Sequence, residues 1–545
     1  MEVTQTYARP STAQTDATGM KFDFSAELSR KPVSIQALIK NSLSYARLML
    51  ALRQVVKSDW RPVQKDHTAY QDWVMERYLE ELPEHLKDIA PEKAKLLLKR
   101  EKLKTELRKL QGQVAPLQAE MNKARRSYYD WLYKHDREQW IVLDPVVSVH
   151  PDGVIFEAFS LDESSYGRVT VPVSNLEVFG KVDYGTTNID FSQVLANELY
   201  RVRSYRPAWL KVSFEKVELS TFVGAAVEKK IDLPVSWVKG FLQVQAASTF
   251  EGIDLKLHSQ TVANMLFHLE AKKEKASPRS LRFVLKKGQP IQIVIDPWQI
   301  TLTDPHIYQG ETVEEIRIWG RRRLLVLKEL LPYSDEVHVK LMGTGMPSYW
   351  TVQSEGHRFD LGLSGWSAND WSKKAGFDLL ASTTEVSKKV LEKTEKLIIK
   401  QLSLTPPEAA QALGISREEA TAALQTLCKL GQAMYDHLTQ SYRWRQLLQQ
   451  DLKLPETEED ERLKYAMQLF KNKKVKLKNQ IQEQDDLVRY EFEVEGKSLY
   501  KPVLHLDQDG RVKQAVCTCS FARRNKLRLG PCPHMMAAIV SLLKR

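Results

Sequence analysis

Three of the four cysteines in this chain are clustered near its C-terminal end, beside a histidine. Their spacing is Cys-x-Cys, twelve intervening residues, and then Cys-x-His. On an extended chain, residues two positions apart point to the same face, so both sulfurs of a Cys-x-Cys pair can reach one ion. Soft thiolates select zinc over magnesium or calcium, and three cysteines with one histidine form a closed tetrahedral set. The pattern therefore predicts one structural zinc ion held by Cys517, Cys519, Cys532 and His534.

The alternative is three buried or redox-active cysteines beside an unrelated histidine. The sequence has no run of about 18 apolar residues that would span a membrane, and its polar N-terminus lacks the apolar core of a secretory signal. We therefore expect a cytoplasmic protein. In a reducing cytosol, clustered cysteines beside a histidine favour metal binding over disulfides.

The residues around the ligands predict a small fold of strands followed by a helix, spanning 485–545. Val488, Tyr490, Phe492 and Val494 alternate with polar residues, as in a half-buried strand. Turn residues then separate two further strands, and apolar residues after His534 mark a closing amphipathic helix.

This arrangement resembles a SWIM-type zinc finger. Phe521, two positions after the second cysteine, and Gly530, two positions before the third, also fit the family pattern. The resemblance implies a zinc-binding module that contacts DNA or proteins. The chain as a whole is similar to standalone bacterial SWIM proteins, often encoded beside AAA+ ATPases and von Willebrand A-domain proteins, so the resemblance suggests those two classes as partners.

The charge distribution favours a polyanionic partner. The formal net charge is +11, and residues 511–545 hold eight Lys or Arg and no Asp or Glu. The insert between the ligand pairs, 520–531, is predicted to be an exposed basic loop that contacts phosphates. A solvated loop facing an acidic protein partner would have the same composition. The candidate contacts are Arg523, Arg524, Lys526 and Arg528.

A second candidate module spans residues 384–448. Three predicted helices, a tight turn at Gly414 and two hairpin-like strands resemble a winged helix-turn-helix domain. In DNA-binding members the third helix enters the major groove and the wing touches phosphates. Glu418 and Glu419 at the front of that helix argue against this role, and such domains also bind proteins. The candidate contacts are Arg417, Lys429, Arg443 and Arg445.

The remaining sequence predicts a multidomain α+β protein. We expect a flexible leader over 1–33, and a helical, coiled-coil-like region over 34–139 with a heptad stripe from Leu103 to Tyr128. Residues 140–303 form a β-rich α+β region, 304–380 an α/β segment, and 449–484 a basic linker or helix. Within 304–380 we expect a helix over 314–332, whose arginines 321–323 are more typical of a solvated face than of a phosphate clamp.

Nothing in the sequence indicates an enzyme, because it has neither a phosphate-binding loop nor a recognisable carboxylate triad. We therefore expect a non-enzymatic zinc-binding protein that binds nucleic acid, DNA above all, through the winged-helix-like segment and the finger. The alternative is an adaptor of a multiprotein complex, in which the finger and the helical N-terminus are docking modules.

Overall fold

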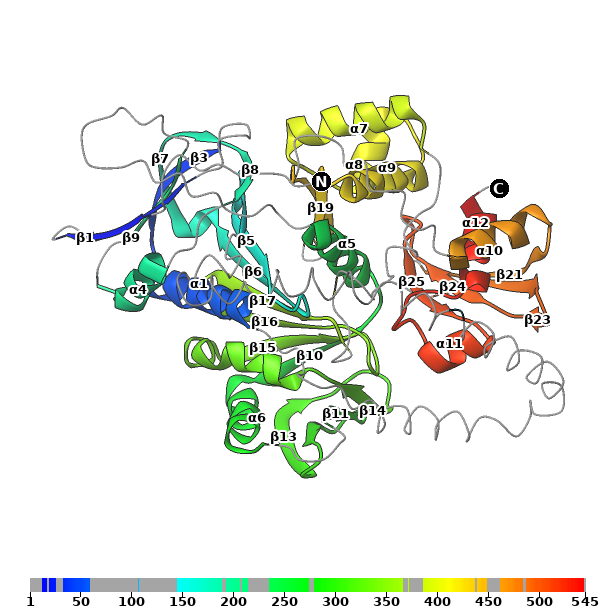
Figure 1. Ribbon diagram of the computed structural model, residues 1–545, viewed down its shortest axis with the longest axis horizontal. Coiled ribbons are helices and arrows are strands. Elements are labelled where there is room, and N and C mark those ends of the chain that lie inside the picture. Colours follow the sequence, from blue (N-terminus) through cyan, green and yellow to red (C-terminus); the bar gives the residue numbers. More distant parts are fainter. Residues whose placement is uncertain are drawn as a thin grey trace. The chain divides into compact units, whose positions relative to one another are not determined.

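The computed structural model divides the chain into two compact units, residues 1–61 with 143–545, and residues 62–142. The predicted heptad stripe lies outside the described residues, apart from Glu106, which is helical. The first unit holds the helices and strands labelled in Figure 1. The structure describes residues 12–16, 19–25, 33–58, 106, 145–188, 193–205, 208–213, 235–273, 279–365, 371, 386–436, 439–447, 461–483 and 487–543.

The N-terminal residues form strands of a five-stranded sheet. In the order of the sheet these are β1 (Thr12–Asp16), β2 (Gly19–Ser25), β9 (Ala208–Ser213), β3 (Ser34–Ile39) and β7 (Leu176–Asp183). The expectation of a flexible leader was therefore wrong for β1 and β2. The start of the region expected to be helical, 34–139, is β3 followed by α1 (Ser42–Lys57). Residues 34–39 bury every second side chain, which is the period of a strand.

An antiparallel eight-stranded sheet forms the centre of the unit. Its apolar face packs on α1, which contacts β5, β6 and β17 (Figure 1). A Cβ on Gly167 would lie 2.9 Å from Leu52 Cδ1, so glycine permits this close approach. The order is β10 (Ile253–His258), β15 (Glu336–Leu341), β16 (Ser348–Ser354), β17 (His357–Leu363), β6 (Ser165–Pro172), β5 (Gly153–Phe159), β4 (Val146–His150) and β8 (Gly185–Asn188).

A four-stranded antiparallel sheet occupies much of the region 281–318. Its order is β13 (Ile300–Ile307), β12 (Pro290–Ile295), β11 (Leu281–Leu285) and β14 (Val313–Ile318). The helices described between residues 193 and 271 are α4 (Gln193–Arg201), α5 (Val235–Ser248) and α6 (Ser259–Ala271).

The helix expected over 314–332 was wrong. Its first part is β14, Gly320 then adopts a left-handed conformation (φ 72°), and 3-10 segments follow at Arg321–Glu329 and Leu331–Tyr333. Arg321 and Arg323 are buried, so the solvated-face interpretation fails for these two side chains.

Residues 388–444 have the predicted element order. The elements are α7 (Lys388–Gln401), β18 (Ser403–Leu404), α8 (Pro406–Leu413), α9 (Arg417–Lys429), β19 (Ala433–Asp436) and β20 (Ser441–Trp444). Thr405 and Glu408 form a capping box: each backbone N–H donates to the other's side chain. Cys428 is buried in the apolar core of this segment, with Leu424 and Tyr442.

The C-terminal element begins earlier than predicted. The region expected to be a basic linker or helix, 449–484, contributes a helix, α10 (Glu461–Lys471), which packs on α12. It also contributes a strand, β21 (Val475–Gln482), which pairs along β22. The sheet order is β21-β22-β24-β25, with β23 paired to β22. The remaining elements are β22 (Val488–Glu495), β23 (Leu499–Tyr500), β24 (Val503–Leu506), β25 (Val512–Val516), α11 (Ser520–Asn525) and α12 (Pro533–Leu543).

The prediction of a mixed α/β chain is confirmed, with several antiparallel sheets among the described residues. In that part of the chain, no helix is both long enough and apolar enough to cross a membrane.

Candidate metal centre and the basic side chains

The structure brings the four predicted ligands together. Cys517 follows β25, Cys519 caps α11, and Cys532 and His534 lie at the start of α12. One potential ligand atom from each of the four lies within 4.8 Å of all the others. Among the described residues this is the group that can hold a metal ion.

The backbone around the cysteines favours thiolates. The Ala522 N–H donates to Cys519 Sγ over 3.4 Å, and the Met535 N–H donates to Cys532 Sγ over 3.5 Å. Both donors belong to first turns of helices, where backbone N–H groups have no helical carbonyl to bind. Such donors stabilise negative charge on sulfur, which is the form that binds metal.

The imidazole of His534 is held by aromatic packing. It stacks on Tyr500 with ring centroids 4.0 Å apart, and Tyr465 meets it edge-on at 6.5 Å. A Cβ on Gly496 would lie 3.3 Å from His534 Nε2, so Nε2 faces the Gly496 turn. His534 Nδ1 lies 3.9 Å from Cys532 Sγ, so Nδ1 is the nitrogen on the sulfur side.

Without a cation the three sulfurs compete for protons. Hydrogen bonds from Cys517 and Cys532 hold the pKa of Cys519 far below its usual range. The hydrogen bond between Cys517 and Cys519 raises the pKa of Cys517 to about 12. Hydrogen bonds with Cys517 and Cys519 raise the pKa of Cys532 as well. A divalent cation would let all three ionise, so the donor set fits a soft metal such as zinc.

The basic segment between the ligand pairs contains the short helix α11. It presents Arg523, Arg524 and Lys526 as side chains that are not buried, in contrast to Arg528. The Arg528 guanidinium donates to the backbone carbonyls of Asn525 (3.0 Å from Nε) and Arg524. Arg528 therefore holds the segment in shape, and its burial argues against the phosphate contact expected of it.

Arg443 and Arg445, the expected wing contacts, are also buried. Arg443 is 5% exposed and donates to both carboxylate oxygens of Asp152 (2.7 and 2.6 Å) and to Asp436 (3.0 Å). Arg445 is 1% exposed, donates to Glu157 over 2.7 Å, and lies over the Phe241 ring. Acidic partners and burial leave neither side chain open to phosphate.

The N-terminal turn of α9 contacts the C-terminal element. Arg417 pairs with Asp509 (2.7 Å) and donates to Gln508 (2.9 Å), both in the turn between β24 and β25. A Cβ on Gly510 in the same turn would lie 3.4 Å from Glu418 Cγ. Lys429 lies in the last turn of α9. The basic side chain at the front of α9 is thus paired with an acidic one, and exposed Glu418 adds negative charge beside it.

A buried polar row crosses the central sheet, and sequence reasoning missed it. Arg168 in β6 lies directly between Glu157 in β5 and Asp360 in β17, all three buried. Arg168 pairs with Asp436 over 2.9 Å, and the Tyr166 hydroxyl donates to Glu157 over 2.6 Å. The available signal was a charged residue near the centre of each of the three strands.

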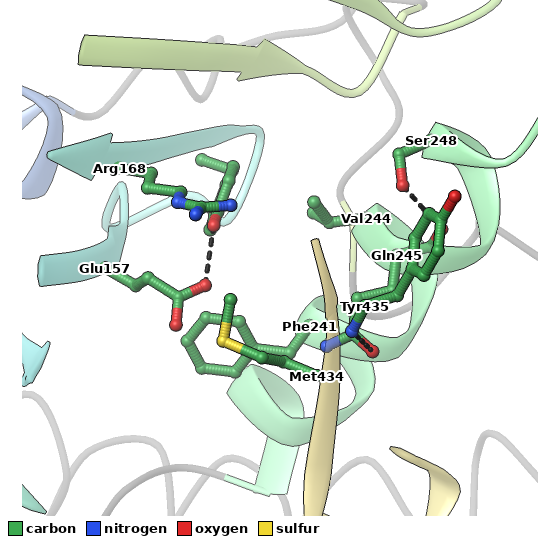
Figure 2. A pocket seen from close by; sticks show the side chains of 9 residues that line it. Glu157, Arg168, Phe241, Val244, Gln245, Ser248, Met434 and Tyr435 are labelled. Carbon is green, nitrogen blue, oxygen red and sulfur yellow. Dashed lines mark hydrogen bonds between the residues drawn. The ribbon is translucent and has the colours of Figure 1, made fainter. Parts of the chain in front are cut away.

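A small cavity opens beside this row, between the sheet, α5 and β19 (Figure 2). It has room for about one water molecule. Glu157, Arg168 and Gln245 on its wall already have protein hydrogen-bond partners. The row and its cavity are therefore explained as packing between the sheet and the winged-helix-like segment.

No family model matches this chain, and no curated protein matches it. Solved structures that match include proliferating cellular nuclear antigens from Entamoeba histolytica and Thermococcus kodakaraensis, and the PCNA2–PCNA3 complex from Sulfolobus tokodaii. Each is 10% identical to this chain over a match that covers 41% of it. In the order named, the match covers 89%, 90% and 90% of the neighbour, with TM-scores of 0.28, 0.27 and 0.28. At such TM-scores the likeness carries no argument about this chain.

Proposed function

We propose that this chain is a non-enzymatic protein that binds nucleic acid, DNA above all, through a C-terminal SWIM-type finger. One structural zinc ion, held by Cys517, Cys519, Cys532 and His534, would fix the basic segment in place. The observation that carries the proposal is the accessibility of Arg523, Arg524 and Lys526 between the two ligand pairs.

The zinc would be structural because four protein ligands leave no open coordination position for water or substrate. Its binding free energy would stabilise a small element whose apolar core includes Leu469, Val494 and Met536. The held segment lies in a stretch, residues 511–545, that contains eight Lys or Arg and no acidic residue. Phosphate contacts from such a segment give sequence-independent, salt-sensitive binding.

We propose a different role for residues 384–448. Their element order supports a winged-helix fold, but Arg443 and Arg445 are buried in ion pairs and Arg417 pairs with Asp509. This segment would connect the central sheet to the finger. The finger alone would then carry the nucleic-acid contact.

The test uses the full chain. Elemental analysis should find one zinc per chain, and fluorescence anisotropy should detect binding to labelled DNA. Replacing Arg523, Arg524 and Lys526 with alanine should weaken binding without loss of zinc. A matched control replaces Lys388, Lys389 and Lys393, three lysines of α7, and should bind like the wild type.

Protein docking is the competing use of the same segment. If the wild type binds neither DNA nor RNA, the nucleic-acid proposal fails, and a partner with an acidic surface becomes the better explanation. The family resemblance makes an AAA+ ATPase and a von Willebrand A-domain protein the first partners to test. Salt-sensitive co-purification that the alanine variant abolishes would support this outcome.

A further inference from the structure

Two tyrosines gather around the metal-ligating histidine. Tyr500 from β23 stacks on the His534 ring, and Tyr465 from α10 meets the same ring edge-on. Tyr500 is half-buried, so its packing on the ligand accounts for its position. Tyr465 is 38% exposed, although it lies beside a buried ring. Packing alone does not require an aromatic side chain at such an exposed position.

Basic side chains flank these tyrosines. Lys464 precedes Tyr465, and Lys497 and Lys501 lie on either side of β23; all three are exposed. The Lys501 N–H donates to the Thr518 hydroxyl over 3.0 Å, which ties this strand to the loop between Cys517 and Cys519. The surface therefore combines positive charge with the accessible ring of Tyr465.

We propose that this surface binds single-stranded nucleic acid, with a base stacked on the exposed ring of Tyr465. The inference rests on the proposed function and specifies its substrate class. Proteins that bind single strands combine a positive surface along the backbone with aromatic rings on which bases stack. In a duplex the base faces are already stacked on each other, so an exposed tyrosine gains no such contact.

The experiment compares zinc-loaded wild type and Tyr465→Ala, using labelled oligothymidylate and a duplex of equal length. The wild type should bind the single strand more tightly than the duplex. Tyr465→Ala should weaken single-strand binding by about fivefold or more and leave duplex binding unchanged. Tyr465→Phe should restore single-strand binding, because it keeps the ring.

Two controls separate stacking from structure. Zinc content must be unchanged in both Tyr465 variants, which shows that His534 still binds the metal. Tyr333→Ala removes a tyrosine of similar exposure (37%) from a 3-10 segment and should have no effect on binding.

The outcomes distinguish this inference from the proposed function. If Tyr465→Ala binds the single strand as tightly as the wild type, while the Arg523/Arg524/Lys526 variant binds weakly, the stacking surface is refuted and the function stands. Equal wild-type affinity for single strand and duplex also overturns the inference. If the wild type binds neither probe, the proposed function fails and the inference with it.

Discussion

The winged-helix-like segment and the C-terminal finger carry similar basic residues in different surroundings. Arg443 and Arg445 are buried against Asp152 and Glu157, whereas Arg523 and Arg524 on α11 are exposed. A guanidinium inside a protein must be paired, because leaving its charge unpaired there costs several kcal/mol. Arginines on a wing therefore indicate nucleic-acid binding only where the chain supplies no buried carboxylate for them.

The largest expected effect is the removal of the metal. Cys532→Ser should release zinc and unfold the C-terminal element, since structural zinc contributes on the order of 10 kcal/mol to such folds. Elemental analysis and hydrogen exchange over residues 461–543 would measure this. Cys428→Ala is the matched control, because that cysteine is buried in the winged-helix-like core and should leave zinc bound. A Cys532→Ser protein that retains its zinc would refute the ligand assignment.

The next effect sharpens the contrast between the two arginine sets. Arg445→Ala should destabilise the fold by about 3–5 kcal/mol, because it leaves Glu157 buried without its cation. Arg523→Ala should change stability by less than about 0.5 kcal/mol, as expected of an exposed side chain. Denaturant unfolding measures both. If both substitutions lower the free energy of unfolding by the same amount, the buried ion pair of Arg445 does not contribute more to stability than the exposed Arg523.

A double substitution isolates the pair itself. Arg445→Ala combined with Glu157→Gln removes both charges without restoring the packing and should recover much of the stability missing in Arg445→Ala. If the double variant is as unstable as the single one, the destabilisation comes from packing on Phe241 and not from the unpaired carboxylate.

A smaller effect depends on pH. Burial is the main cause that lowers the pKa of His150 to about 3, and the positive charges of Arg443 and Arg168 lower it further. The carboxylates of Asp152 and Asp436 act in the opposite direction. The unfolded chain takes up this proton below about pH 6.5 and the folded chain does not, so stability falls as pH drops from about 6.5 toward 3. At pH 5 the loss is about 2 kcal/mol.

His150→Asn should remove that part of the acid sensitivity. Unfolding free energies at pH 7.5 and pH 5, measured for both proteins, give the difference directly. The pKa of His357 is also lowered by burial, to about 4, but it contributes equally to both proteins and cancels. Identical pH dependence in the two proteins would mean that His150 is not the titrating group.

The smallest effect concerns the capping box at the start of α8. Thr405→Ala removes the side-chain acceptor for the Glu408 N–H and should cost about 1 kcal/mol. Thr405→Ser keeps the hydroxyl and should be close to neutral. Thermal unfolding can measure the difference, and a neutral Thr405→Ala would show that solvent replaces the cap.

Local sequence signals predicted the parts of this molecule that depend on neighbours in the chain. The ligand spacing and the turn at Gly414 correspond to observed features. Residues 34–39 and 314–318 were expected to be helical, but they pair with strands distant in sequence. Tertiary pairing overrode their local helical pattern.

Burial of the basic side chains could not be predicted in the same way. Asp152 and Glu157, which pair with Arg443 and Arg445, lie 291 and 288 residues away along the chain. Arg528 donates to carbonyls of its own turn, and its side chain lies close to Gly345, which is distant along the chain. Charge alone does not separate these arginines from Arg523 and Arg524.

The most direct test of the central claim is the salt dependence of DNA binding by zinc-loaded protein. Removing one cation that binds a phosphate reduces the slope of log affinity against log salt by about 0.9 for duplex DNA. The alanine variant of Arg523, Arg524 and Lys526 should therefore show a slope shallower by about 2–3. The variant of Lys388, Lys389 and Lys393 should keep the wild-type slope. A wild-type slope in the first variant, or no binding by the wild type, would contradict the account.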